Sequence, residues 1–153
     1  AILDFDVHHG NGTQQIFEID PSVLFVSSHQ MPLYPGSGAP DETGVGNIHN
    51  LPLAPGSGSA ALQAAWARVG LPAVDAFAPD LILVSAGFDA HERDPLAQLE
   101  ARDSDFEWLT REIMSLADSH CDGRLVSILE GGYDLQGLAS ASRAHVEALS
   151  RAG

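Results

Sequence analysis

Four short apolar runs recur along the chain, and each of them leads into small or polar residues. They cover residues 1–7, 23–26, 81–84 and 125–129. In the first run apolar side chains alternate with Asp4 and Asp6, as expected for a strand. Short apolar runs bounded in this way are typical of the buried strands of a parallel sheet. We therefore predict a strand at each position.

Segments with a helical composition separate these runs. Three helical segments are predicted, over residues 59–77, 106–116 and 135–149. Gly70 and Pro72 are expected to kink or break the first of them. Ser104 and Glu107 have the spacing of a capping box at the start of the second. The alternation of strands and helices predicts the α/β class with a mainly parallel sheet.

Residues 30–55 are rich in Pro, Gly and Asn, which predicts a long loop with a short strand near residues 47–53. A loop of this length within a compact domain is usually functional. In open α/β folds, sites gather beyond the carboxyl ends of the strands. Polar residues that follow the predicted strands are therefore the first candidates for a site.

The composition and net charge limit the possible partners and the compartment of the protein. The chain has 153 residues, enough for one domain, and a formal net charge of −14 from 21 acidic and 7 basic residues, all seven of them Arg. This charge argues against nucleic acid and agrees with either a cationic partner or simple solubility. The single cysteine, Cys121, excludes an intramolecular disulfide and fits a reducing compartment such as the cytoplasm. No apolar run reaches the roughly 18 residues of a membrane span.

Asp4, Asp6 and His8 follow one another at every second position. In an extended backbone all three side chains share one face of the strand. A divalent cation would relieve the cost of bringing them together, and Asp and His donors without Cys suit zinc or iron(II). A solvated strand end is the alternative, and the spacing alone leaves both open.

The neighbouring residues add a resemblance. Residues 4–14, DFDVHHGNGTQ, resemble the metal-binding signature of the histone deacetylase family, in the form of its class II and bacterial members. Four further blocks continue the resemblance in order: VSSH at 26–29, YPGSG at 34–38, SAGFDAHERDPL at 85–96 and LEGGYDL at 129–135. The resemblance implies a three-layer arginase/deacetylase-like fold. It also implies that residues 1–153 are the C-terminal portion of a single catalytic domain, incomplete at its N-terminal side.

The resemblance also implies a metal centre. Its zinc ligands would be Asp6, His8 and Asp94, with a coordination position open for water and substrate; iron(II) is the alternative metal. A turn cap ahead of Pro95 is the competing interpretation of Asp94. Tyr133 matches the catalytic tyrosine, whose hydroxyl would stabilise the oxyanion of the substrate.

Two further groups of residues receive roles from the family. Asp4, Ser27 and Ser28 match a monovalent-cation site that also uses main-chain oxygens of Asp6 and His8, and potassium suits such oxygen donors. Tyr34, Gly131 and Gly132 match the tunnel that takes the acyl-lysine chain. Asp89 is expected to be an internal hydrogen-bonding residue.

The implied activity is zinc-dependent hydrolysis of the acetamide of acetylated lysine side chains by an activated water. The family's general base is one of two adjacent histidines upstream of the metal motif, on a segment this chain lacks. His8 and His9 cannot replace that pair, because His8 is assigned to the metal. An acetylpolyamine amidohydrolase and a truncated, non-catalytic metal-binding module are the alternatives. The expected partner is an acetylated protein or an acetylated polyamine.

Overall fold

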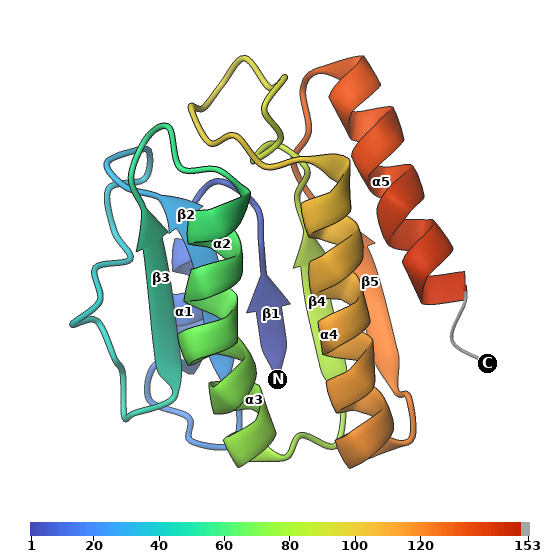
Figure 1. Ribbon diagram of the computed structural model, residues 1–153. Coiled ribbons are helices and arrows are strands. Elements are labelled where there is room, and N and C mark those ends of the chain that lie inside the picture. The colour runs from blue at the N-terminus through green and yellow to red at the C-terminus, as the bar shows by residue number, and fades with distance from the viewer. Residues whose placement is uncertain (151–153) are drawn as a thin grey trace.

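The computed structural model describes residues 1–150, which form a five-stranded, all-parallel sheet with helices packed on it (Figure 1). Its strands are β1 (Ile2–Asp4), β2 (Phe25–Gln30), β3 (Ile48–Leu53), β4 (Ile82–Ala86) and β5 (Leu125–Leu129). Their order across the sheet is β3-β2-β1-β4-β5. Strands β2 and β3 therefore lie on one side of β1, and β4 and β5 lie on its other side. This arrangement confirms the predicted α/β class with a parallel sheet.

The helices lie on both faces of the sheet. They are α1 (Asn11–Phe17), α2 (Ser59–Ala65), η1 (Trp66–Gly70), α3 (Leu71–Phe77), α4 (Asp103–Cys121) and α5 (Leu135–Ser150). In Figure 1, α2, α3 and α4 cover the near face, α1 lies behind the sheet, and α5 packs beside α4 next to β5. None of the helices within residues 1–150 has the length and apolarity to cross a bilayer.

The strands lie close to their predicted positions, with one informative difference. The run over residues 1–7 forms a strand only at Ile2–Asp4. After Asp4 the backbone turns, and the Asp4 carboxylate accepts a hydrogen bond from the backbone N–H of Asp6 (3.0 Å). Asp4, Asp6 and His8 therefore do not share one extended face. Helix α1 was not predicted, since its short sequence NGTQQIF has no side-chain cap.

The predicted helix over residues 59–77 is helical throughout, so the expected break does not occur. Its middle turn, η1, is a π-helix, and Pro72 follows it in the first turn of α3. Pro72 has no backbone N–H, and it follows the wider π-turn, in which the N–H of Leu71 donates to the carbonyl oxygen of Trp66. The irregularity is therefore one wide turn rather than a break.

The start of α4 is a second correction. The helix begins at Asp103, and the Asp105 carboxylate, rather than the expected Ser104–Glu107 pair, accepts the backbone N–H of Arg102 (2.8 Å). This fully buried carboxylate also accepts hydrogen bonds from Ser59 Oγ (2.6 Å) and Gln63 Nε2 (2.8 Å). Asp105 thus caps α4 and joins it to α2 with the same two oxygens.

The core is formed between the sheet and helices α2, α3 and α4. Leu3, Trp66 and Phe106 belong to it and are at most 2% exposed. Strand β5 differs from the central strands, because Val126 and Ile128 remain 49% and 53% exposed. Parallel sheets usually have both faces covered. An apolar surface therefore lies open along β5.

His145 joins α5 to α4 and β5 through a buried network. Thr110 Oγ1 donates its only hydrogen to the Phe106 carbonyl oxygen (2.5 Å), so the Nδ1–H of His145 must donate to Thr110 Oγ1 (2.6 Å). His145 Nε2 then accepts from Ser127 Oγ (2.8 Å). Burial lowers the pKa of His145 to about 4, so the ring is neutral at pH 7.

We predict a pH-dependent effect of His145→Gln on stability. In the unfolded chain a histidine takes up its proton near pH 6.5, whereas folded His145 stays neutral until about pH 4. Stability that depends on the neutral ring is therefore lost as the pH falls between these values. The wild-type advantage over His145→Gln should shrink by up to ~1.4 kcal/mol per pH unit below 6.5.

Denaturant unfolding of both proteins between pH 7 and pH 4 measures this difference, and pH effects of other groups cancel in the comparison. A difference that stays constant across the range would show that His145 is not held in its neutral form.

Candidate metal centre

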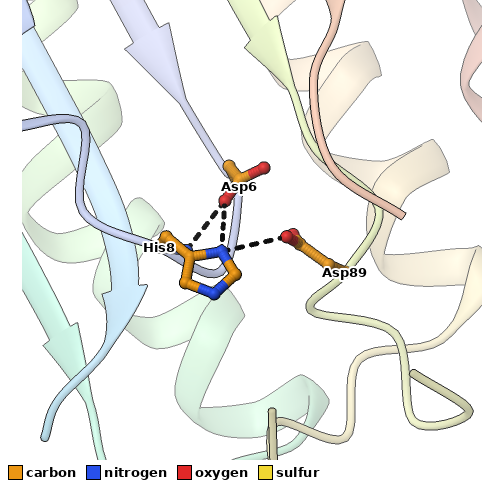
Figure 2. Close-up of side chains that lie close together, drawn as sticks. All are labelled: Asp6, His8 and Asp89. Atoms are coloured by element: carbon orange, nitrogen blue, oxygen red, sulfur yellow. Dashed lines mark hydrogen bonds and ion pairs between the residues drawn. The ribbon is translucent and has the colours of Figure 1, made fainter. Parts of the chain in front are cut away.

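The carboxyl ends of β1, β4 and β5 meet at one edge of the sheet, where the strand order reverses between β1 and β4. Asp6 and His8 follow β1, and Asp89 follows β4. One potential ligand atom from each of these three side chains lies within 4.8 Å of the others (Figure 2). A reversal of strand order opens a crevice in α/β sheets, and ligands bind there. The topology therefore places the cluster where this fold provides a site.

The His8 ring is the centre of the cluster. Its Nδ1 atom lies 3.1 Å from Asp6 Oδ1 and 3.1 Å from Asp89 Oδ2. Both carboxylate oxygens are acceptors, and a single ring N–H can serve two of them only through long, shared contacts. Two carboxylates and one imidazole facing a common point are a donor set suited to a divalent cation.

Backbone groups hold both carboxylates in place. Asp6 Oδ1 accepts the N–H of His8 (2.8 Å), and Asp6 Oδ2 accepts the N–H of Gly131 (2.9 Å). Asp89 Oδ1 accepts the N–H of Val7 (2.8 Å). The segments after β1, β4 and β5 are therefore linked through the side chains that could bind the metal, which fixes their relative positions.

The electrostatics of the cluster favour a bound cation. The Asp89 side chain is fully buried, and burial together with the negative charge of Asp6 raises the pKa of Asp89 to about 7. Without a cation, one of the two carboxylates is thus close to taking up a proton at neutral pH. A divalent cation would stabilise the ionised form of both. The donor set and its charge fit a metal ion.

Glycines after β5 let the backbone approach this cluster. A Cβ atom added at Gly131 would overlap Asp89 Oδ2 and lie 2.6 Å from Asp6 Oδ2. Gly132 has a φ angle of +142°, and a Cβ atom there would lie 2.8 Å from Leu138 Cδ1. Side chains at these two positions would displace the carboxylates or strain the backbone that leads to Tyr133.

Asp94, the third metal ligand expected from the resemblance, is not among the three residues of this cluster, and its role as a ligand stays a prediction. Its buried carboxylate accepts hydrogen bonds from the backbone N–H groups of Tyr133 (2.7 Å), Asp134 (3.3 Å) and Leu96 (3.0 Å). Asp89, which the sequence analysis expected to be an internal hydrogen-bonding residue, lies 3.1 Å from His8 Nδ1.

Tyr133 stands next to the cluster with its side chain 54% exposed. Partial burial and the negative charges of Asp89, Asp6 and Asp94 raise the pKa of its phenol. The hydroxyl therefore keeps its proton at neutral pH and can donate a hydrogen bond. Tyr34, the other predicted tunnel aromatic, is 80% exposed on the loop between β2 and β3.

The residues predicted to bind a monovalent cation are buried together. Asp4 pairs with Ser27 across β1 and β2, and Ser28 follows in β2. All three are at most 5% exposed. Burial and the nearby charge of Asp6 raise the pKa of Asp4 well above its usual value. A cation beside these oxygens would favour the ionised form, and the potassium site stays a prediction.

Two histidines beside the cluster are fully used in hydrogen bonds. His29 Nε2–H donates to the Gly38 carbonyl oxygen (2.9 Å), so its Nδ1 accepts from Ser27 Oγ (3.0 Å). Burial lowers the pKa of His29 to about 4. His29 is therefore a neutral structural residue that holds the loop after β2.

His9 is arranged in the same way. Gln14 Nε2 donates to the Glu42 carboxylate (2.6 Å), which leaves Gln14 Oε1 to accept from His9 Nε2–H (2.9 Å). His9 Nδ1 then accepts from Ser37 Oγ (2.8 Å). Burial lowers the pKa of His9, so this ring also connects the metal-site segment to the loop in its neutral form.

Comparisons with known proteins agree with the fold. The family model described as "Histone deacetylase domain" matches residues 1–149. A "Probable deacetylase" of Archaeoglobus fulgidus is 46% identical over 141 residues, which are 90% of this chain and 39% of the relative. "Histone deacetylase 10, chloroplastic" of Oryza sativa is 49% identical over 143 residues, 91% of this chain and 32% of the relative.

A solved structure, that of the HDA15 HD domain, superposes with a TM-score of 0.91 at 39% identity. It covers 99% of this chain, which in turn covers 44% of the solved chain. The chain thus spans about a third to two fifths of the length of the two curated relatives, and its sheet is that of the arginase/deacetylase fold. On its sequence and its fold, the chain belongs to the histone deacetylase family.

Proposed function

We propose that this chain forms the metal-binding part of a zinc-dependent deacetylase that hydrolyses the acetamide of acetylated lysine side chains. Family membership supports a deacetylase. The convergence of Asp6, His8 and Asp89 on one point is the observation that supports a metal-dependent reaction.

Zinc is the metal that we assign to this site. Asp6 and His8 are two of its proposed ligands, and the third carboxylate is that of Asp94, as the resemblance implies, or that of Asp89, which lies in the cluster. Catalytic zinc sites commonly have three protein ligands and keep a further position open for water and substrate. His8 is 27% and Asp6 14% exposed at the side chain, so solvent reaches the cluster. Iron(II) accepts the same ligand types, and metal content distinguishes the two.

A bound zinc ion would polarise the acetyl carbonyl and lower the pKa of the attacking water. Tyr133 would donate its phenolic hydrogen to the oxygen of that carbonyl as negative charge develops on it. The raised pKa of Tyr133 favours this role, because only the protonated phenol is a donor. Gly131 and Gly132 keep the backbone close enough to the cluster for the hydroxyl to reach the substrate.

The group that takes the proton of the water lies, in this proposal, outside residues 1–153. His8 is assigned to the metal, and both ring nitrogens of His9 and of His29 are engaged in hydrogen bonds. None of these rings has a nitrogen left for proton transfer. We assign the general base to a histidine from another part of the catalytic domain, of which residues 1–153 are one portion.

The remaining assignments follow the same scheme. Asp4, Ser27 and Ser28 would hold a potassium ion behind the zinc site, and Tyr34 would line the path of the acyl-lysine chain. The net charge of −14 suits a cationic protein segment around the acetylated lysine. It suits an acetylated polyamine equally, so the substrate test includes both.

A cytoplasmic location stays a prediction, since some relatives are named as chloroplastic.

The ligand set predicts the effect of Asp89→Asn. An amide cannot supply the second negative charge, so the variant should lose most of its bound zinc, whereas wild-type protein should hold about one zinc per chain. Elemental mass spectrometry after dialysis measures the content. Asp118→Asn, an exposed position on α4, is the matched control and should keep its zinc. Full zinc content in Asp89→Asn would remove Asp89 from the site.

The role of the phenol predicts the effect of Tyr133→Phe. Loss of one donor to an oxyanion typically lowers kcat by about 10²–10³-fold. Zinc content should not change, because the hydroxyl contacts the substrate rather than the metal ligands. The assay uses the complete catalytic domain, which supplies the general base, and compares an acetyl-lysine peptide with N-acetylputrescine. Turnover of the peptide near the wild-type rate would exclude the tyrosine from the reaction, and exclusive turnover of acetylputrescine would favour the polyamine alternative.

A further inference from the structure

The loop between β2 and β3 packs against the segment that follows the metal-site residue His8. Its tip consists of Ser37, Gly38 and Ala39, and Ser37 contacts His9 of that segment. Tyr34 lies in the same loop with 80% of its side chain exposed. Neighbouring side chains therefore cover little of the Tyr34 ring, and its position depends on the backbone of the loop.

The carboxylate of Glu42 binds the backbone donors of this tip. The N–H of Gly38 lies 3.1 and 3.0 Å from its two oxygens, and Oε1 also accepts the N–H of Ala39 (3.1 Å). Hydrogen bonds, first of all the one from Gln14, hold the pKa of Glu42 below its usual value, so the group is ionised at neutral pH. Hydrogen bonds to an ionised acceptor are stronger than those between neutral groups. Glu42 is thus a strong internal anchor for the tip.

The same carboxylate reaches the segment after β1 through Gln14. The buried Gln14 side chain donates from Nε2 to Glu42 Oε2 (2.6 Å). Its Oε1 accepts from His9 Nε2–H (2.9 Å) and from Asn50 Nδ2 of β3 (2.8 Å). Because His9 directly follows His8, this network connects the loop tip to the metal-site segment.

The two histidines hold the opposite side of the tip. His29 Nε2–H donates to the Gly38 carbonyl oxygen (2.9 Å), and His9 Nδ1 accepts from Ser37 Oγ (2.8 Å). Gly38 has a φ angle of +92°, and a Cβ atom there would overlap His29 Nε2. Of the three side chains that hold the tip, Glu42 alone belongs to the loop. Its removal therefore frees the tip without changing β2 or the segment after β1.

We propose that Glu42 is a positioning residue for substrate binding: its carboxylate anchors the loop tip and so holds Tyr34 along the path of the acyl-lysine chain. This role rests on the proposed function, in which Tyr34 lines that path. Glu42 acts through the backbone of the loop. A loop that is already ordered loses little conformational entropy when the substrate binds. Loss of the anchor should therefore weaken substrate binding more than it slows the chemical step.

The test compares Glu42→Ala with Asp41→Asn in the complete catalytic domain loaded with zinc. In Glu42→Ala, the KM for an acetyl-lysine peptide should rise by about 3- to 10-fold, and kcat should change by less than about twofold. Glu42→Gln keeps one acceptor oxygen and should have a smaller effect. Asp41→Asn removes the same charge from the exposed neighbouring residue and should leave KM unchanged. An equal rise of KM in Asp41→Asn would reveal a charge effect and overturn the proposal.

The effect of Glu42 should depend on Tyr34. Tyr34→Ala alone should raise KM, and in that background Glu42→Ala should add almost nothing, because the ring that it positions is absent. An equal further rise of KM would overturn the anchor alone. An unchanged KM in Tyr34→Ala would contradict the place of Tyr34 in the proposed function, and the role of Glu42 would be refuted with it.

Hydrogen exchange measures the anchor without an activity assay. The amide hydrogens of Gly38 and Ala39 should exchange faster in Glu42→Ala than in the wild-type domain. The amide of Gly131, which donates to Asp6, should keep its protection, and the zinc content should stay at about one per chain. Unchanged exchange at Gly38 and Ala39 would overturn the proposal. Faster exchange at Gly131 or loss of zinc would overturn it as well, since either would reveal a general loosening of the site.

Discussion

Two carboxylates held against one imidazole nitrogen are the constraint on which the site depends. Asp6 and Asp89 each come within 3.1 Å of His8 Nδ1, and the second of them is buried. Burial, and after it the negative charge of Asp6, raises the pKa of Asp89, so holding both carboxylates here in ionised form is costly. The backbone N–H groups of Val7 and Gly131 donate to Asp89 and Asp6 and hold the two carboxylates together. A cation between them would be attracted by both negative charges.

The parallel sheet is what brings these residues together. Its strand order reverses at β1 and β4, so the segments after these two strands diverge and leave their polar residues around a common opening. The segment after β5 closes the third side with Gly131, where only a hydrogen fits beside Asp89. Residues from distant parts of the sequence thus reach one point because three neighbouring strands end at one edge.

The sequence was sufficient for the outline of this arrangement. The four apolar runs lie close to β1, β2, β4 and β5 of the structure, although Val126 and Ile128 of β5 are exposed. Helix α1 could not be predicted in this way, because seven residues with a glycine and no cap carry little periodicity. The residue that caps α4 could not be predicted either, because the Asp105 carboxylate also accepts a hydrogen bond from Ser59 of another helix.

Asp89 and Asp94 show most clearly where a sequence stops being informative. Both lie in the SAGFDAHERDPL block, and composition does not say which carboxylate turns towards His8. The folded structure shows that Asp89 lies 3.1 Å from His8 Nδ1. Asp94 and Asp105 each accept three hydrogen bonds within the protein. Asp6 also has three such contacts, so hydrogen bonds alone do not exclude a carboxylate from binding a metal.

Asp89 accepts one backbone N–H and directs its other oxygen at the shared His8 nitrogen. A buried carboxylate with too few donors is costly, and a metal ion is the partner that would complete it. This shortage of donors is the reason why Asp89 is a candidate for the metal site beside Asp6. That property belongs to the folded structure and becomes visible only there.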